Sequence, residues 1–284
     1  MQLAPIHLVV YKRLEHTKQA INALLTNSLA KDSVLIVSSD GAADGDEIDV
    51  ENVRSYVRSV SGFKKIIINE SKYNTLQERM RLPVKDSIDI LEEYGRKITL
   101  EDDVVVAPHF LEYMNEGLNK YENDDNIAII SGFNPIKYAK INTGVFITEY
   151  PHLWGFGMWK RTGYKEAITD FDAYDNLIGD KILYSRYKKK HRNGLKLLEQ
   201  CCREKTPYGD VMMGLMHFKK KQHSIMPYKT LCLNIGFDGT GWHCGNSNTY
   251  DNLILNTDKV VFNDQVSYDK HLDKKIYRTF EQSR

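Results

Sequence analysis

The first hundred residues alternate short apolar runs with segments of helical periodicity. The strand-length runs cover residues 6–11, 34–37, 65–68 and 96–100. The helical segments between them cover residues 16–29, 49–59 and 82–94. Strands that alternate with helices in this order predict an α/β fold, in which a mostly parallel central sheet is flanked by helices on both faces. Ligands of such sheets bind beyond the carboxyl ends of the strands.

The second half of the chain is less regular. Further strands are predicted at 127–131, 143–148 and 231–235, and a helix at 206–221. Residues 160–205 read as polar and basic helices and loops, and residues 246–263 are expected to be exposed. Because no repeat or linker divides the chain, we expect a single domain, residues 1–284, with an elaborated C-terminal half.

Composition narrows the class of protein. The chain has 39 Lys and Arg residues against 38 Asp and Glu residues, a formal net charge of +1. This balance argues against a nucleic-acid partner, because dedicated nucleic-acid binders carry a large basic excess. The four cysteines include no CxxC pair, and no apolar run reaches the ~20 residues of a membrane span. Since the N-terminal stretch also lacks the long apolar centre of a signal peptide, we expect a cytoplasmic protein.

An acidic cluster is the sharpest chemical signal. Glu101, Asp102 and Asp103 interrupt the apolar stretch 98–108, directly after the fourth predicted strand. Like charges held together in apolar surroundings need a cation or solvent. Oxygen ligands suit Mg²⁺ or Mn²⁺, which complete their shells with phosphate oxygens and water. The alternative is an acidic surface turn in which one Asp caps the next helix, but the position at a strand end favours the metal.

Four stretches in order along the chain carry a family pattern. They are residues 6–17, residues 100–113 with their Glu-Asp-Asp, the glycine-aromatic stretch 154–159, and the glycine-rich stretch 234–244. Together they resemble GT-A-type glycosyltransferases, most closely the N-acetylglucosaminyltransferase I group and its bacterial relatives. The resemblance implies a Rossmann-like GT-A fold with a nucleotide-binding half (1–106), an acceptor-binding and catalytic half (107–245) and a C-terminal extension (246–284).

The resemblance also implies roles for single residues. In that family a Glu-Asp-Asp replaces the usual DxD motif, so Asp103 is the expected ligand of Mn²⁺, with Mg²⁺ as the other option. Glu101 and Asp102 would contact the donor or metal-bound water, and Asp40 would accept a hydrogen bond from the nucleobase. Phe156 and Gly157 belong to the loop that lies beneath the donor sugar in the family.

A base is needed if transfer proceeds with inversion, because the acceptor hydroxyl must lose its proton as it attacks the sugar. Asp210 follows Pro207-Tyr208-Gly209 at a predicted helix start, and the resemblance places a catalytic Asp in this region. The alternative role for Asp210 is a helix N-cap. The rival acids lie on a more polar stretch: Asp170, Asp172 and Asp175.

Basic residues and a histidine complete the candidate donor site. Arg13 follows the first strand, where it would pair with phosphate, stack on the base or simply solvate a loop. The sequence does not decide which of Arg79, Arg81 and Lys85 also neutralises a diphosphate. His243 lies in the glycine-rich stretch, where it is expected to contact phosphate or metal, with a purely structural role as the alternative.

These features predict a metal-dependent glycosyltransferase. It would transfer a sugar from a nucleotide-sugar, with UDP as the expected nucleotide, to a saccharide or lipid-linked acceptor in bacterial surface polysaccharide synthesis, with Asp210 as base. Two basic runs, 186–192 and 219–221, fit either a solvated helix face or peripheral contact with the anionic inner face of a membrane. The alternatives are a sugar nucleotidylyltransferase, a non-catalytic nucleotide- or sugar-binding module, and a glycoside hydrolase.

Overall fold

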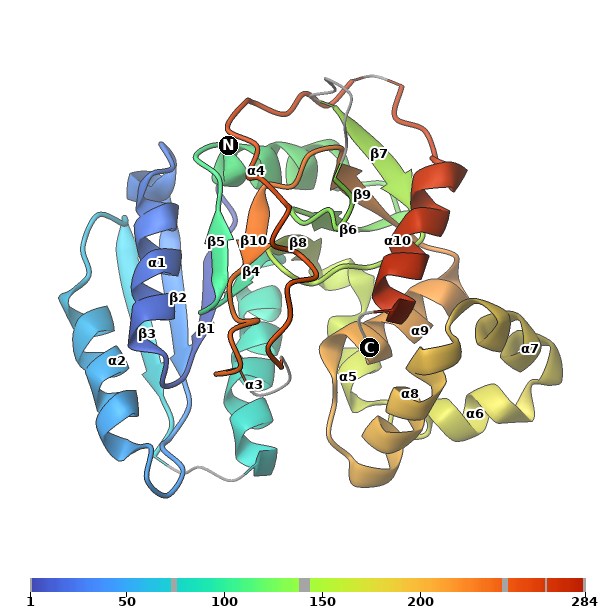
Figure 1. Ribbon diagram of the computed structural model, residues 1–284, viewed down its shortest axis with the longest axis horizontal. Coiled ribbons are helices and arrows are strands. Elements are labelled where there is room, and N and C mark those ends of the chain that lie inside the picture. Colours follow the sequence, from blue (N-terminus) through green and yellow to red (C-terminus); the bar gives the residue numbers. More distant parts are fainter. Residues whose placement is uncertain (1, 73–75, 138–143, 242–244, 264, 283–284) are drawn as a thin grey trace.

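The computed structural model describes residues 2–72, 76–137, 144–241, 245–263 and 265–282 (Figure 1). The main sheet comprises β1 (Ile6–Val10), β2 (Val34–Ser39), β3 (Lys65–Glu70), β4 (Arg96–Glu101), β6 (Ile127–Ser131), β7 (Val145–Thr148), β8 (Phe156–Trp159) and β9 (His223–Pro227). Their spatial order is β3-β2-β1-β4-β8-β6-β9-β7. β8 and β7 run antiparallel to their neighbours, and the other strands run parallel. The expected α/β class and mostly parallel sheet are confirmed.

Helices cover both faces of this sheet (Figure 1). They are α1 (Leu14–Leu25), α2 (Glu47–Ser59), α3 (Leu76–Tyr94), α4 (Phe110–Lys120), α5 (Tyr164–Thr169), α6 (Ala173–Gly179), α7 (Lys181–Lys190), α8 (Arg192–Glu204), α9 (Gly209–Lys220) and α10 (Lys270–Gln282). Successive strand residues point to opposite faces, so side chains of the sheet pack into two apolar core layers, one on each face. In one layer Ile6 and Leu8 pack with side chains of α1, α2 and α4; in the other Met158 packs with side chains of α3, α5 and α9.

The glycine-aromatic stretch is a strand over most of its length, so the expectation of a loop at 154–159 is wrong from Phe156 onward. Phe156–Trp159 form β8 in the middle of the sheet, buried throughout. Gly157 allows this: a Cβ at that position would lie 3.1 Å from a side-chain carbon of Leu118 on α4. The short strand is therefore fixed by close packing against α4, which sequence periodicity does not reveal.

The C-terminal extension is less exposed than predicted. Tyr250, Asn256, Val260 and Phe262 are buried, and the Phe262 ring stacks on Tyr113 of α4 at 5.1 Å. Figure 1 shows this segment running back across the molecule to α10. The extension therefore contributes to the core layer on the α4 side.

A polar network is buried between the sheet and α3. His7 Nε2 lies 2.7 Å from Ser38 Oγ, which donates to Asp86, and His7 Nδ1 lies 3.2 Å from Ser87 Oγ. Lys97 Nζ donates to the same Ser87 oxygen at 2.6 Å. Burial lowers the pKa of Lys97 to about 7, and burial followed by the charge of Lys97 lowers the pKa of His7 well below its usual value. His7 and Lys97 occupy positions on β1 and β4 that the sequence pattern presents as plain strand residues, and Ser38 lies on β2 just beyond the predicted run 34–37.

In the described part of the chain, no helix combines the length and apolar character needed to cross a membrane.

Candidate functional site

The acidic cluster lies where β4 leaves the main sheet. Glu101 is the last residue of β4, and β5 (Val104–Val106) begins after Asp103 to pair antiparallel with β10 (Cys232–Asn234). Because β1, β2 and β4 are parallel, the segments that follow them meet at the same edge of the sheet. The sequence prediction that residues after these strands share an edge is confirmed by this register.

Arg13 joins the end of β1 to the acidic cluster. Its guanidinium pairs with the carboxylates of Asp102 and Asp103, and the Nη2 atom lies 2.8 Å from Asp103 Oδ2. Burial lowers the pKa of Arg13, but the two carboxylates outweigh this effect and raise it, so Arg13 stays charged. Burial raises the pKa of Asp102, while Arg13 acts in the opposite direction. A single cation thus lies between two buried carboxylates.

The loop after β10 closes over this pair. The Ile235 backbone amide donates to the carbonyl oxygen of Asp103 at 2.8 Å, and Asn234 Nδ2 approaches Asp103 Oδ1 at 3.4 Å. Gly236 comes so close that a Cβ on it would lie 2.2 Å from Asp103 Oδ2 and 2.9 Å from Arg13 Nη1. Only a glycine fits here without displacing the ion pair, which explains why the sequence has one at this point of the glycine-rich stretch.

Glu101 differs from its two neighbours because it is exposed, whereas Asp102 and Asp103 are buried. Although part of its surface is exposed, surrounding protein atoms crowd its carboxyl; this partial loss of hydration, followed by the charges of Asp103 and Asp102, raises the pKa of Glu101 to about 8, against the effect of Arg13. Asp210 adds to this rise, so it lies within electrostatic reach of Glu101. Three carboxylates and one guanidinium leave excess negative charge at this edge.

Asp210 lies within electrostatic range of the cluster and comes from the second half of the chain. It lies in the first turn of α9, and its side chain is half-buried. The N-terminus of a helix stabilises a nearby carboxylate through its unpaired amides. Tyr208, not Asp210, occupies the N-cap position, so the alternative role of Asp210 as the N-cap is not the one it has here.

Asp40 lies directly after β2 and is buried. Arg54 of α2 donates to the backbone carbonyls of Asp40 and Ser71, each at 2.8 Å. This arginine therefore ties together the ends of β2 and β3. Asp46, further along the same loop, accepts from the Tyr11 hydroxyl at 2.8 Å and pairs with Lys12 at 2.9 Å. These contacts position the loop after β2 against the end of β1.

Phe156 and Gly157, which were expected to lie beneath the donor sugar, do not join the acidic cluster. Phe156 and Gly157 are core residues of β8, so they lie inside the sheet and not on an open loop. Trp154 instead makes edge contacts with Phe237 and Tyr250, each with ring centroids 5.5 Å apart. This aromatic group, which also includes a Phe237–Tyr250 contact at 5.3 Å, brings the glycine-rich loop and the C-terminal extension together.

Several candidates fall elsewhere. His243 and the side chains of Arg79 and Arg81 lie outside the described residues. Lys85 is exposed and pairs with Asp89 on its own helix at 2.6 Å. Sequence reasoning missed His16, whose Nε2 lies 3.2 Å from Asp238 Oδ2 and links α1 to the loop after β10. His16 and Asp238 are far apart in the sequence, so no local sequence pattern could have predicted this contact.

The donor set at this edge fits a divalent cation that is shared with phosphate. Within the described ranges, no group of three or more His, Cys, Asp or Glu side chains is arranged to hold a metal on its own. Mg²⁺ and Mn²⁺ at nucleotide sites, however, take only one or two carboxylates and fill their shells with phosphate oxygens and water. Asp102 and Asp103 place two carboxylates against the single guanidinium of Arg13, so this edge could offer one or two carboxylates to such an ion.

Comparisons with known proteins give structural matches only. No protein-family model matches the chain, and no curated protein matches it. Two solved structures are a mannosyltransferase, PcManGT of Pyrobaculum calidifontis, in complex with GDP-Man and Mn²⁺, and residues 1–349 of S. aureus TarS. The first has 10% identity and a TM-score of 0.39, with 58% of this chain and 47% of that one covered. The second has 12% identity and a TM-score of 0.37, with 58% and 49% covered.

A third match is a putative nucleotide-diphospho-sugar transferase from Desulfovibrio desulfuricans G20, with 13% identity and a TM-score of 0.31. It is aligned over 56% of this chain and 64% of its own length. The chain therefore spans about half to two thirds of the length of these structures. None of the three is described as a member of the N-acetylglucosaminyltransferase I group, so that finer resemblance gains no support from them.

Proposed function

We propose that this chain is a metal-dependent glycosyltransferase that takes its sugar from a nucleotide-sugar donor. The observation that carries the proposal is the ion pair of Arg13, after β1, with the acidic cluster after β4, at an edge of the sheet that lies within electrostatic range of Asp210 on α9. This edge joins an anionic metal-binding set to a permanent cation and a separate carboxylate. A metal-dependent, inverting transfer of a sugar with loss of a nucleoside diphosphate uses these three elements.

In this proposal Asp103 holds Mn²⁺ or Mg²⁺ together with the donor diphosphate, and Asp102 and Glu101 contact the donor or metal-bound water. A bound divalent cation supplies positive charge to the departing diphosphate. Arg13 holds Asp102 and Asp103 in place and offers its guanidinium to phosphate oxygens. Asp40, buried after β2, accepts from the nucleobase, for which UDP is the expected carrier.

Asp210 serves as the general base. It removes the proton of the acceptor hydroxyl as that oxygen attacks the anomeric carbon, which gives inversion at that carbon. Its separation from Asp102 and Asp103, on another element and half-buried, keeps it out of the Arg13 ion pair. The proposed acceptor is a saccharide or a lipid-linked saccharide of bacterial surface polysaccharide synthesis.

The first experiment is a calorimetric titration of UDP, GDP, CMP and dTDP, with Mn²⁺ and then with EDTA. We expect one nucleotide to bind in the presence of Mn²⁺ and Asp103→Asn to lose that binding. Asp32→Asn, an exposed carboxylate next to the start of β2, is the control and should bind as the wild type does. If no nucleotide binds under any condition, the proposed function is wrong.

A second candidate is a non-catalytic nucleotide- or sugar-binding module. It is favoured by the Arg13 ion pair, which engages both buried aspartates and would serve as a purely structural clasp. The two functions separate in one assay. A transferase releases nucleoside diphosphate from its donor when acceptors are supplied, whereas a binding module retains the intact donor.

A further inference from the structure

Two helices of the second half, α7 and α10, carry exposed Lys and Arg side chains that form no ion pair with an acidic side chain in the described part of the chain. On α7 these residues are Lys181, Arg186, Lys188 and Lys189. On α10 they are Lys270, Lys274, Lys275 and Arg278. We call these eight residues the basic face. On α10, Lys270, Lys274 and Arg278 recur every four residues with Lys275 beside them, while Leu272 and Ile276 of the same helix are buried in the core.

The acidic side chains of these helices do not balance the basic face. Asp180 caps α7, where it accepts from the backbone amides of Ile182 and Leu183. Asp269 does the same at the start of α10. Asp273 is buried and accepts from Thr148 Oγ1 at 2.7 Å and from Tyr268. These three acids are thus engaged by groups of their own helix ends or of the core, and none of them forms an ion pair with the basic face.

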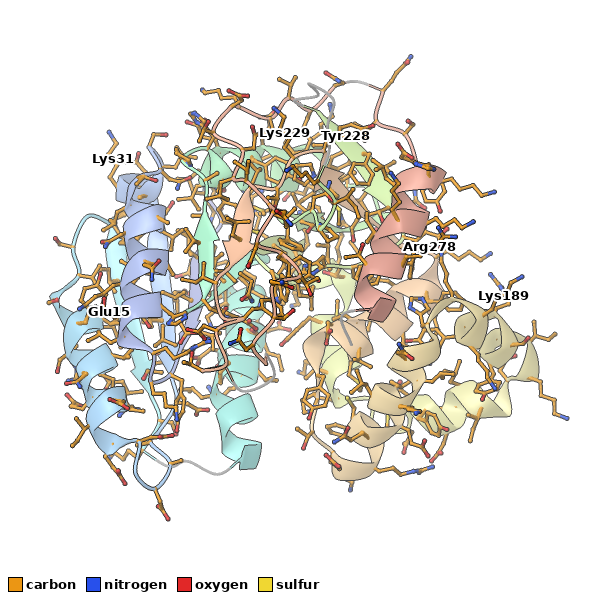
Figure 2. The ribbon with its side chains drawn as sticks, viewed as in Figure 1. Glu15, Lys31, Lys189, Tyr228, Lys229 and Arg278 are labelled. Atoms are coloured by element: carbon orange, nitrogen blue, oxygen red, sulfur yellow. The ribbon has the colours of Figure 1, made fainter. Side chains whose placement is uncertain are left out.

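The two helices form one continuous surface. The ring of His191, at the end of α7, meets the ring of Tyr277 on α10 with centroids 5.2 Å apart. Lys190 Nζ lies 4.9 Å from the centre of the same Tyr277 ring. Lys189 and Arg278, the exposed neighbours of these contact residues, lie on the same side of the molecule in Figure 2. The basic charges of α7 and α10 therefore add up over one patch.

This patch gives the chain a strong charge asymmetry. Removing its eight residues from the 39 basic residues of the chain leaves 31 basic residues against 38 acidic ones. The overall charge of +1 therefore hides a positive face on a protein that is otherwise negative. Such a distribution orients a protein toward an extended anionic surface.

An apolar side chain accompanies the charges. Ile182, next to Lys181 on α7, is 76% exposed, and Ile178 at the end of α6 is 43% exposed. Large apolar side chains gain nothing from exposure to water, whereas beside lysines they insert into the boundary between lipid headgroups and acyl chains. Exposed aliphatic side chains beside lysines match the boundary of a lipid bilayer, whereas single-stranded nucleic acids are bound chiefly by stacking on aromatic side chains.

We propose that the basic face is a docking site for an anionic lipid bilayer. Lys and Arg of α7 and α10 attract the headgroups, and Ile182 inserts at the boundary. The chain then lies on the membrane with α7 and α10 against the lipid. This site is separate from the acidic cluster after β4, and the proposal stands whether or not the chain transfers a sugar.

The test is co-sedimentation of the full chain with vesicles of phosphatidylcholine alone and of phosphatidylcholine with phosphatidylglycerol, without nucleotide or metal. We expect binding only to the anionic vesicles, weakened by salt. The variant Lys188→Gln, Lys189→Gln, Lys274→Gln, Lys275→Gln should bind about tenfold more weakly or worse, because each basic residue near such a surface adds to the affinity. Ile182→Ser should weaken binding to a smaller extent.

The control removes the same number of charges elsewhere. Lys31, Lys64, Lys65 and Lys72 are exposed, and Lys31 lies on the opposite side of the molecule in Figure 2. Their combined change to Gln should leave vesicle binding as in the wild type. Equal loss in both variants would overturn the proposal, because it would show a nonspecific charge effect. Binding of DNA or an anionic polysaccharide without binding of anionic vesicles would overturn it as well.

Discussion

Arg13 and Asp103 are 90 positions apart in the chain, yet the guanidinium Nη2 lies 2.8 Å from the carboxylate Oδ2. The same Arg13 nitrogen pairs with Asp102, and Gly236 closes over the group. The ion pair ties the end of β1, the end of β4 and the loop after β10 into one unit. It therefore holds the acidic cluster in place before any ligand binds.

Loss of the arginine should destabilise the protein strongly. Arg13→Ala leaves two buried carboxylates without their cation, which typically costs about 3–5 kcal/mol of unfolding free energy. Urea denaturation followed by circular dichroism measures this change. The double variant Arg13→Ala, Asp102→Asn should recover part of the loss, since it removes one of the stranded charges. A loss below about 1 kcal/mol for Arg13→Ala would show that the pair contributes little.

A methyl group at Gly236 should disturb the same unit. In Gly236→Ala the added Cβ would lie 2.2 Å from Asp103 Oδ2, so the loop or the ion pair must shift. We expect a cost of about 1–3 kcal/mol in unfolding free energy and weaker nucleotide binding. Gly245→Ala is the matched control, because a Cβ there meets no atom within 4 Å. Equal stability of the two variants would contradict the close approach at Gly236.

The base should affect turnover and not donor binding. We expect Asp210→Asn to lower kcat by about 10²- to 10⁴-fold, the usual contribution of a general base. Calorimetric affinity for the donor nucleotide should stay unchanged, because Asp210 is assigned to the acceptor side. Asp170→Asn and Asp172→Asn, which remove two of the rival acids, should keep wild-type kcat. A large loss in either rival would move the base to that residue.

Glu101 offers a sharper check of that assignment. The raised pKa of Glu101, about 8, makes this carboxyl a competitor for the base, since a group that titrates near neutral pH transfers protons well. Glu101→Gln should lower donor affinity and leave the pH profile of kcat in place. If Glu101→Gln instead abolished the dependence of kcat on pH while donor affinity remained, Glu101 and not Asp210 would be the base.

Because of the buried network beside α3, the free energy of unfolding should depend on pH between pH 7 and pH 10. The pKa of Lys97 is lowered to about 7 by burial, so between pH 7 and pH 10 the unfolded chain holds this proton more tightly than the folded one. Unfolding free energy should therefore rise with pH over this range, by up to about 1.4 kcal/mol per pH unit. Below pH 7 both states are protonated and this contribution is constant.

The variant Lys97→Met removes the titrating group and should flatten this rise. Lys64→Met changes an exposed lysine directly before β3, and this variant should keep the rise in unfolding free energy with pH. Denaturant midpoints measured at half-unit steps from pH 7 to pH 10 provide the comparison. Identical slopes for wild type and Lys97→Met would show that Lys97 does not titrate in this interval.

The sequence by itself determined the α/β class, because short apolar runs alternating with amphipathic helices have few other ways to bury their surface. It also determined that the residues after β1, β2 and β4 share an edge, since parallel strands place their carboxyl ends together. The acidic cluster was visible for the same reason: charges at the end of a buried strand interrupt an apolar pattern. These are local signals, carried by neighbouring residues.

Only the tertiary structure decided which residues meet across the chain. Phe156 lies in a central strand because Gly157 packs against α4, and the approach of Gly236 to Asp103 depends on the loop after β10. The basic face exists because Tyr277 brings α10 against the end of α7. Contacts of this kind join elements that are distant in sequence, and their register follows from packing and not from periodicity.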